Sequence, residues 1–282
     1  MGERSSIAFL WLEITGRCQL ACVHCYAGSS PSGSHGSMIT EDWKRVIGEA
    51  ADAGVRTVQF IGGEPTLHPG LADLIDYALR HTLKVEVFTN LVHVTDILWE
   101  TFSRPGVSLA TSYYSADPGR HAAITGRPTH ARTRANIAKA VGAGIPLRAG
   151  IIDLDPDQHT DRADSELAGL GVRAIGYDRF RGLGRGARGD LVPATQLCGQ
   201  CGLGSAAVSP DGTVWPCVMA RWMAVGNVRQ HSLGEILAEL PGARADLTKQ
   251  GMRVTVDQTM NTGTCTPCGP QGNCYPIHCH PR

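Results

Sequence analysis

The amino-acid sequence predicts an α/β protein, a partial (β/α)6 TIM-like barrel with a cysteine-rich C-terminal extension. Short apolar segments alternate with helix-forming segments six times before residue 180. The ten cysteines form two groups, three between residues 18 and 25 and seven between residues 198 and 279. Six strand–helix alternations predict a parallel sheet with helices on its outside. They are too few for the closed eight-stranded barrel.

The elements follow in chain order. The predicted strands cover residues 7–14, 55–61, 84–88, 107–112, 146–152 and 172–177. Each is an apolar run of the kind that parallel sheets bury on both faces. The predicted helices cover residues 40–53, 70–81, 95–102, 129–141 and 160–170; the first has acidic residues in its first turn and stops at Gly54. We place the barrel in residues 1–190 and the extension in residues 191–282.

Composition narrows the class of protein. At 282 residues the chain can form one large domain with an appendage. Because 26 Lys and Arg balance 26 Asp and Glu, the bulk charge favours neither nucleic acid nor an acidic membrane as a partner. We find no apolar run of membrane-spanning length and no signal peptide, so we expect a cytoplasmic protein. Ten cysteines in that compartment indicate metal binding or redox chemistry rather than disulfides.

Three cysteines follow the first predicted strand directly. Cys18, Cys22 and Cys25 are separated by three and then two residues. On one loop their thiolates can meet at one small concave site and hold an iron–sulfur cubane, which needs four ligands. One iron then stays open to a small molecule. A zinc knot and buried free thiols are the alternatives.

This Cys-x3-Cys-x2-Cys run resembles the signature of the radical SAM superfamily. The resemblance implies a partial-barrel fold and a [4Fe-4S] cluster whose open iron is chelated by S-adenosylmethionine (SAM). It also implies that His24, the residue before the third cysteine, packs near the adenine. In this family the cluster is reduced by one electron and SAM is cleaved to a 5′-deoxyadenosyl radical, which abstracts hydrogen from an unactivated C–H bond.

Further residues at the carboxyl ends of the predicted strands match the family. Gly62-Gly63-Glu64 follows the second strand and resembles the Gly-Gly-Glu motif that binds the amino group of the SAM methionine moiety. Asn90 and Ser112 follow the third and fourth strands, where relatives carry polar residues directed at the SAM ribose or carboxylate. We expect further polar residues to rim the substrate space above SAM: Tyr113, Tyr114, Asp153, Asp155, Asp157, Asp178 and Arg179.

The C-terminal cysteines resemble the SPASM extension of radical SAM enzymes, which carries auxiliary [4Fe-4S] clusters. Residues 209–217 predict a β-hairpin with Asp211-Gly212 at its turn. By resemblance, the first auxiliary cluster takes Cys198, Cys201, Cys217 and Cys279, and the second takes Cys265, Cys268 and Cys274. The fourth ligand of the second cluster is missing; His278 or His280 could supply it, or that cluster is absent. Zinc is the alternative metal for this region.

Two reactions and two substrate classes stay open. Auxiliary clusters suit oxidation, since they accept the electron left on a substrate radical. Alternatively Cys274 or Cys279, if not a ligand, returns a hydrogen atom and inverts a stereocentre. SPASM enzymes most often crosslink, oxidise or epimerise residues of ribosomally made peptides, whereas others act on aminoglycoside or aminocyclitol sugars. The first strand begins within ten residues of the N-terminus, which leaves no room for a leader-binding domain, and Asp153, Asp155 and Asp157 would suit a polycationic sugar. We favour a peptide, with a flavodoxin- or ferredoxin-type reductant.

Overall fold

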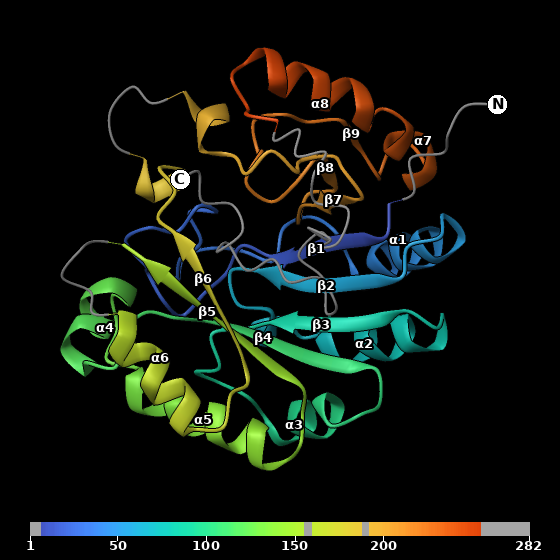
Figure 1. Ribbon diagram of the computed structural model, residues 1–282. Coiled ribbons are helices and arrows are strands. Elements are labelled where there is room, and N and C mark those ends of the chain that lie inside the picture. The colour runs from blue at the N-terminus through green and yellow to red at the C-terminus, as the bar shows by residue number, and fades with distance from the viewer. Residues whose placement is uncertain (1–6, 155–159, 188–191, 255–282) are drawn as a thin grey trace.

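The protein has an open, curved sheet covered on its outer face by helices (Figure 1). The computed structural model describes residues 7–154, 160–187 and 192–254. Nine strands form one sheet in the order β6-β5-β4-β3-β2-β1-β7-β8-β9. Strands β1 to β6 pair in parallel with their sequence neighbours. The predicted partial (β/α)6 barrel is therefore confirmed.

The barrel elements lie close to their predicted positions. The strands are β1 (Phe9–Thr15), β2 (Thr57–Gly62), β3 (Lys84–Phe88), β4 (Val107–Tyr113), β5 (Leu147–Asp153) and β6 (Ala174–Arg179). The helices are α1 (Thr40–Asp52), α2 (Leu71–Arg80), α3 (Asp96–Phe102), α4 (Pro118–Thr125), α5 (His130–Gly142) and α6 (Thr160–Gly169). A short 3-10 helix, η1 (Pro65–Leu67), follows β2, and two more, η3 (Gly184–Gly186) and η4 (Pro193–Gln196), follow β6.

Burial explains why these segments adopt these forms. All seven residues of β1 are buried, as a strand covered on both faces requires. In α1 the buried positions Trp43, Val46, Ile47 and Ala50 recur at helical spacing and face the sheet. The side chain of Thr95 accepts a hydrogen bond from the Leu98 backbone and caps the start of α3.

The sequence prediction missed α4, which lies in a segment predicted as a loop. The Asp117 side chain caps its start by accepting a hydrogen bond from the Arg120 backbone, and Pro118 occupies its first turn. Gly126 ends the helix in a left-handed conformation, at φ 73°. These signals flank only eight residues, too few for apolar periodicity to show.

The C-terminal region extends the barrel sheet. Strands β7 (Ser205–Val208) and β8 (Thr213–Trp215) form the predicted antiparallel hairpin, and β9 (Gly226–Asn227) pairs with β8. Strand β7 also pairs in parallel with β1, with Leu10 opposite Ala206. Helices α7 (Leu233–Ala238) and α8 (Leu240–Lys249) follow. Because the extension shares the barrel's sheet, the predicted boundary after residue 190 separates two parts of one continuous sheet.

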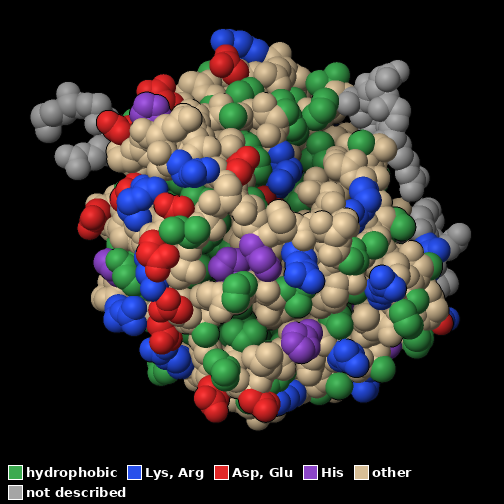
Figure 2. Space-filling view, turned by 180° about the vertical axis from the view of Figure 1, so that it is seen from behind, with side chains coloured by type: hydrophobic (Ala, Val, Ile, Leu, Met, Phe, Trp, Pro, Cys, Tyr) green, Lys and Arg blue, Asp and Glu red, His purple; other side chains and the backbone are tan. Residues whose placement is uncertain are grey.

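Two features of the exterior bear on possible partners. No helix within the described ranges is long and apolar enough to cross a membrane. Acidic and basic side chains both occur on the face shown in Figure 2, and no continuous field of one sign covers it.

We predict that Trp43→Ala lowers the free energy of unfolding by about 3–5 kcal/mol, because it leaves a cavity in the core. Trp43 is fully buried between α1 and the sheet. Chemical denaturation under anaerobic, reducing conditions measures the change, with Trp43→Phe as the aromatic control that leaves a smaller cavity and loses less. A loss below about 1 kcal/mol in the alanine variant would show that this position does not anchor the core.

Candidate active site

A cavity of about 470 Å3 runs from the barrel interior to the carboxyl ends of its strands. All six barrel strands contribute lining residues, and so do Cys18, Cys22 and Cys25. Its size is within the range usual for small-molecule and cofactor sites. The three cysteines predicted from their spacing therefore meet at the open end of the barrel.

Neighbouring backbone groups fix the cysteine loop after β1. The Cys18 backbone donates to the Ser30 carbonyl at 3.0 Å. The backbones of Ala21 and Val23 donate to the carbonyls of Thr125 and Ile124, each at 3.0 Å. These two carbonyls belong to the last turn of α4, so the helix missed from the sequence holds the middle of the loop.

Two thiols of the loop, those of Cys18 and Cys22, are poor acids in this setting. Burial, together with nearby negative charge, raises the pKa of Cys18 to about 12. Burial and the neighbouring Cys25 raise the pKa of Cys22 to about 12, against a lowering by Arg185. Thiolates in this pocket therefore depend on a cation that compensates their charge, as iron does when it binds sulfur.

Glu64 lies at the end of β2, with its side chain fully buried. Its Oε1 atom accepts hydrogen bonds from the Thr66 backbone and hydroxyl and from the Thr89 hydroxyl, at 2.7–3.0 Å. Its Oε2 atom accepts one, from the Asn90 backbone at 2.8 Å. Burial raises the pKa of this carboxyl, and these hydrogen bonds oppose the rise. Oε2 keeps acceptor capacity for one more donor, such as an ammonium group.

The packing of the protein backbone requires glycine at positions 62 and 63, whether or not a ligand is bound nearby. Gly62 has a φ of 137°, and a Cβ there would lie 2.2 Å from the Thr15 carbonyl oxygen. A Cβ on Gly63 would lie equally close to the Arg17 carbonyl oxygen. The sequence assigned these glycines to a motif that binds SAM; the structure adds that they let the end of β2 approach the base of the cysteine loop.

The predicted cofactor residues divide here: Gly62, Gly63, Asn90, Ser112 and His24 line the cavity, whereas Glu64 is fully buried and is not among its lining residues. Asn90 binds the loop: its Nδ2 atom lies 3.8 Å from Cys18 Sγ and 3.3 Å from Gln19 Oε1. Ser112 is hydrogen-bonded to the Tyr114 phenol. His24 packs edge-on against the Tyr114 ring, with centroids 4.9 Å apart.

Three cysteines of the extension gather beside the barrel. Cys201 and Cys217 are buried, and their Sγ atoms lie 2.8 Å apart. Cys198 is exposed, and its charge influences Cys201. The remaining predicted ligands and hydrogen donors lie outside the described residues: Cys265, Cys268, Cys274, Cys279, His278 and His280.

Comparison with known proteins places this geometry in a family. The sequence profile of the radical SAM superfamily matches residues 12–164, more than half of the chain. The chain belongs to the radical SAM superfamily. The profile of the SPASM iron–sulfur cluster-binding domain matches residues 198–269.

Three known proteins resemble this chain in sequence or in fold. The subtilosin biosynthesis protein AlbA of Bacillus subtilis is 27% identical, with 79% of this chain and 58% of AlbA aligned. A PqqA peptide cyclase of Streptomyces rochei is 30% identical, with 59% of this chain and 50% of the cyclase aligned. The structure of Streptococcus suis SuiB bound to its precursor peptide SuiA superposes with a TM-score of 0.71 at 13% identity, over 83% of this chain and 65% of SuiB. This chain spans about half the length of the two curated relatives.

Membership of the radical SAM superfamily implies that the chain binds SAM and a [4Fe-4S] cluster. The match to the SPASM domain implies auxiliary clusters. The residues that line the cavity fit SAM and the [4Fe-4S] cluster. His24 Nδ1 and Ser29 Oγ line the cavity and are buried without a hydrogen-bond partner among the described residues, so they are ready to meet a polar ligand. No three His, Cys, Asp or Glu side chains in the described part of the chain are placed to bind a single metal ion. A cubane differs from one ion because each cysteine binds a separate iron.

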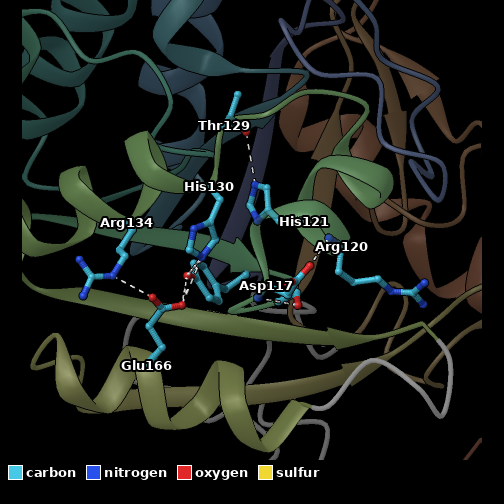
Figure 3. A network of polar contacts seen from close by, with 9 residues as sticks. Asp117, Arg120, His121, Thr129, His130, Arg134 and Glu166 are labelled. Carbon is cyan, nitrogen blue, oxygen red and sulfur yellow. Dashed lines mark hydrogen bonds and ion pairs between the residues drawn. The ribbon is translucent and has the colours of Figure 1, made fainter.

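Tyr113 and Tyr114 point in opposite directions from the end of β4. Tyr114 lines the cavity as predicted. The prediction that Tyr113 rims the substrate space is wrong: it is fully buried under the outer helices, and its hydroxyl contacts His130 at 2.8 Å and Glu166 at 2.5 Å. Glu166 also pairs with Arg134, and this network joins β4, α5 and α6 (Figure 3). Side chains alternate along a strand, so adjacent tyrosines cannot share a face.

Of the other residues predicted to rim the substrate space, some line the cavity and some do not. Asp178 and Arg179 line the cavity, whereas Asp153 is exposed and is not among its lining residues. Asp155 and Asp157 lie outside the described residues.

The sequence analysis missed an ion pair inside the barrel. The Glu86 carboxylate accepts from Arg148 Nε at 2.8 Å and from Arg148 Nη2 at 2.7 Å, and both residues line the cavity. The Arg148 guanidinium also lies over the Phe88 ring, 5.7 Å from its centroid. A charged residue within each of two apolar strand segments was the signal available in the sequence.

We predict that His121→Gln makes stability less dependent on pH. Burial and His130 lower the pKa of His121 to about 4. The unfolded chain therefore binds a proton here below about pH 6.5 while the folded chain does not, so this histidine lowers stability as the pH falls. Between about pH 6.5 and pH 5 the contribution is about 2 kcal/mol. Urea unfolding at both pH values measures it, with exposed His231→Gln as the control. An equal pH dependence in wild type and His121→Gln would refute the assignment.

Proposed function

We propose that this protein modifies a ribosomally made peptide by radical SAM chemistry, most simply by oxidation or crosslinking of a residue. The observation that carries the proposal is the cavity of about 470 Å3 that joins the cysteine loop to the barrel interior and leaves room for a substrate. Its curated relatives include a bacteriocin biosynthesis protein and a peptide cyclase. A solved relative of the same fold holds a precursor peptide.

The charge of the cavity favours a peptide over a polycationic aminoglycoside. Its lining includes more basic than acidic side chains: Arg148, Arg179, Arg181 and Arg185 against Glu86 and Asp178. Two of the arginines are paired with these acids, Arg148 with Glu86 and Arg181 with Asp178. Arg185 is committed to carbonyls of the cysteine loop, so Arg179 supplies the excess positive charge toward the substrate. This charge repels ammonium groups, whereas a guanidinium group binds the carbonyls and carboxylates of a peptide.

When bound, the cluster and SAM would supply the radical chemistry that removes a hydrogen atom from the substrate. The chain's residues bind and orient the reactants and limit access of water. Cys18, Cys22 and Cys25 would hold the cluster, Glu64 Oε2 would accept a hydrogen bond from the SAM ammonium, and His24 would face the adenine. Asn90 and Ser112 would meet the polar groups of SAM. Tyr114 and the pair Glu86–Arg148 would contact the substrate.

The extension would hold auxiliary clusters, which would supply an acceptor for the electron that the substrate radical loses, together with a proton, when it is oxidised. Cys198, Cys201 and Cys217 would hold the first auxiliary cluster together with Cys279, which the 2.8 Å contact between Cys201 and Cys217 supports. Cys265, Cys268 and Cys274 would hold a second cluster. A cytoplasmic location, a flavodoxin- or ferredoxin-type reductant and the boundary after residue 190 remain predictions.

We predict that precursor peptides stimulate formation of 5′-deoxyadenosine and that aminoglycosides do not. The reconstituted protein would be given SAM, dithionite and each member of the two panels, and the nucleoside quantified by chromatography. Cys22→Ala, which removes one cluster ligand, should reduce cleavage to background with every compound. If only aminoglycosides stimulated cleavage, the peptide proposal would be wrong, and dehydrogenation or epimerisation of a sugar would be the better proposal.

We predict that the reconstituted protein holds about twelve irons, since each cubane contains four. The Cys18/Cys22/Cys25→Ala variant should retain about eight of them. Iron and sulfide analysis after anaerobic reconstitution gives both numbers, and Cys198/Cys201/Cys217→Ala is the matched variant for the extension. About eight irons falling to about four would mean one auxiliary cluster with spare thiols, and would favour epimerisation by Cys274 or Cys279 over oxidation.

A further inference from the structure

A turn that follows β6 reaches the cysteine loop that follows β1. Arg185 lies in this turn, and its guanidinium donates to three carbonyl oxygens of the loop. Nε binds Cys22 at 3.0 Å, Nη1 binds Gly28 at 2.9 Å, and Nη2 binds Ser29 at 2.6 Å. The Arg185 backbone also donates to the Cys25 carbonyl at 3.0 Å. One residue thus makes four hydrogen bonds to the segment that carries two of the cluster cysteines.

The turn is shaped for this contact. Gly184 has a φ of 54°, and a Cβ there would lie 2.2 Å from the Tyr26 carbonyl oxygen and 2.5 Å from that of Cys25. Gly186 donates to the Leu183 carbonyl at 2.9 Å, and Leu183 is buried. Only glycine at position 184 allows the turn to approach the loop so closely.

We propose that Arg185 is a positioning residue for the SAM-binding cluster. It holds the segment from Cys22 to Ser29 in its ligand-binding form and keeps a fixed positive charge beside the cluster. A guanidinium suits this task because its rigid fork satisfies several carbonyls at once and stays charged at every relevant pH. The proposal rests on family membership and does not depend on the identity of the substrate.

Two consequences follow from charge and geometry. A nearby positive charge stabilises the reduced cluster, which carries one more electron, and therefore raises the reduction potential. The hydrogen bonds restrain the loop, so their loss should increase local opening. A residue with a merely structural role elsewhere in the barrel would affect neither quantity.

Two substitutions separate these effects. Arg185→Lys keeps the charge but cannot reach three carbonyls together, and Arg185→Gln removes the charge as well. Arg104→Gln is the matched control, since Arg104 is a partly exposed residue in the turn after α3 and pairs with Asp76 of α2. Circular dichroism and thermal unfolding establish that each variant is folded.

The first measurement is hydrogen–deuterium exchange of peptides covering residues 18–30 in the reconstituted and metal-free proteins. We expect exchange to rise about tenfold or more in both Arg185 variants, since each loses hydrogen bonds from a charged donor. Arg104→Gln should match the wild type. Unchanged exchange in both Arg185 variants overturns the proposal, and the metal-free samples decide this even if a variant fails to retain its cluster.

The second measurement is a redox titration that follows the EPR signal altered by SAM, which identifies the front cluster. We expect a lower midpoint potential in Arg185→Gln and a potential close to the wild type in Arg185→Lys. Equal potentials in wild type and Arg185→Gln, or an equal shift in Arg104→Gln, would exclude a specific effect of the Arg185 charge. Failure of the peptide panel would leave these results unaffected.

Discussion

The site depends on the close backbone approach between the end of β2 and the base of the cysteine loop. The Gly63 backbone donates to the Thr15 carbonyl at 2.7 Å, and the Glu64 backbone donates to the Arg17 carbonyl at 2.8 Å. Neither contact could form if Gly62 or Gly63 carried a side chain. The same contacts bury Glu64, whose carboxylate then orders Thr89 and Asn90 at the end of β3. The chain's own contacts thereby fix three strand ends around one cavity, which is the preorganisation that catalysis requires.

A second constraint joins the barrel to the extension. Strand β1 pairs with β2 on one side and with β7 on the other, so both cysteine groups depend on the same strand. Glu13, buried within β1, accepts two hydrogen bonds from Arg221 Nη1, and this guanidinium lies 4.3 Å from the Trp215 ring centroid. Breaking such a pair leaves an uncompensated buried charge, so the contact resists separation of the two parts.

Much of the fold could be predicted because its signals are local. Six apolar segments predicted the six strands of the barrel. The carboxyl ends of these strands predicted the edge of the sheet near which Cys18, Glu64, Asn90 and Ser112 lie. What the sequence could not provide depends on contacts between distant segments: β7 adding to β1, and Arg185 binding the cysteine loop. The opposite directions of Tyr113 and Tyr114 depend on strand register, and a shift of one residue reverses every side chain. Glu86 and Arg148 were readable as charges in apolar strands, but their pairing across the barrel was not.

The shared strand also bears on what the extension does. Electron transfer between cofactors depends steeply on their separation, so two redox sites that work in sequence need a fixed spacing. Tyr26, directly after Cys25, is packed in the same cluster as Cys201 and Cys217, and the charges of Cys25 and Cys217 both act on its hydroxyl. The two cysteine groups thus lie beside a common, partly buried side chain. This rigid arrangement suits an electron acceptor that serves the barrel site in place, and it does not suit a mobile electron carrier.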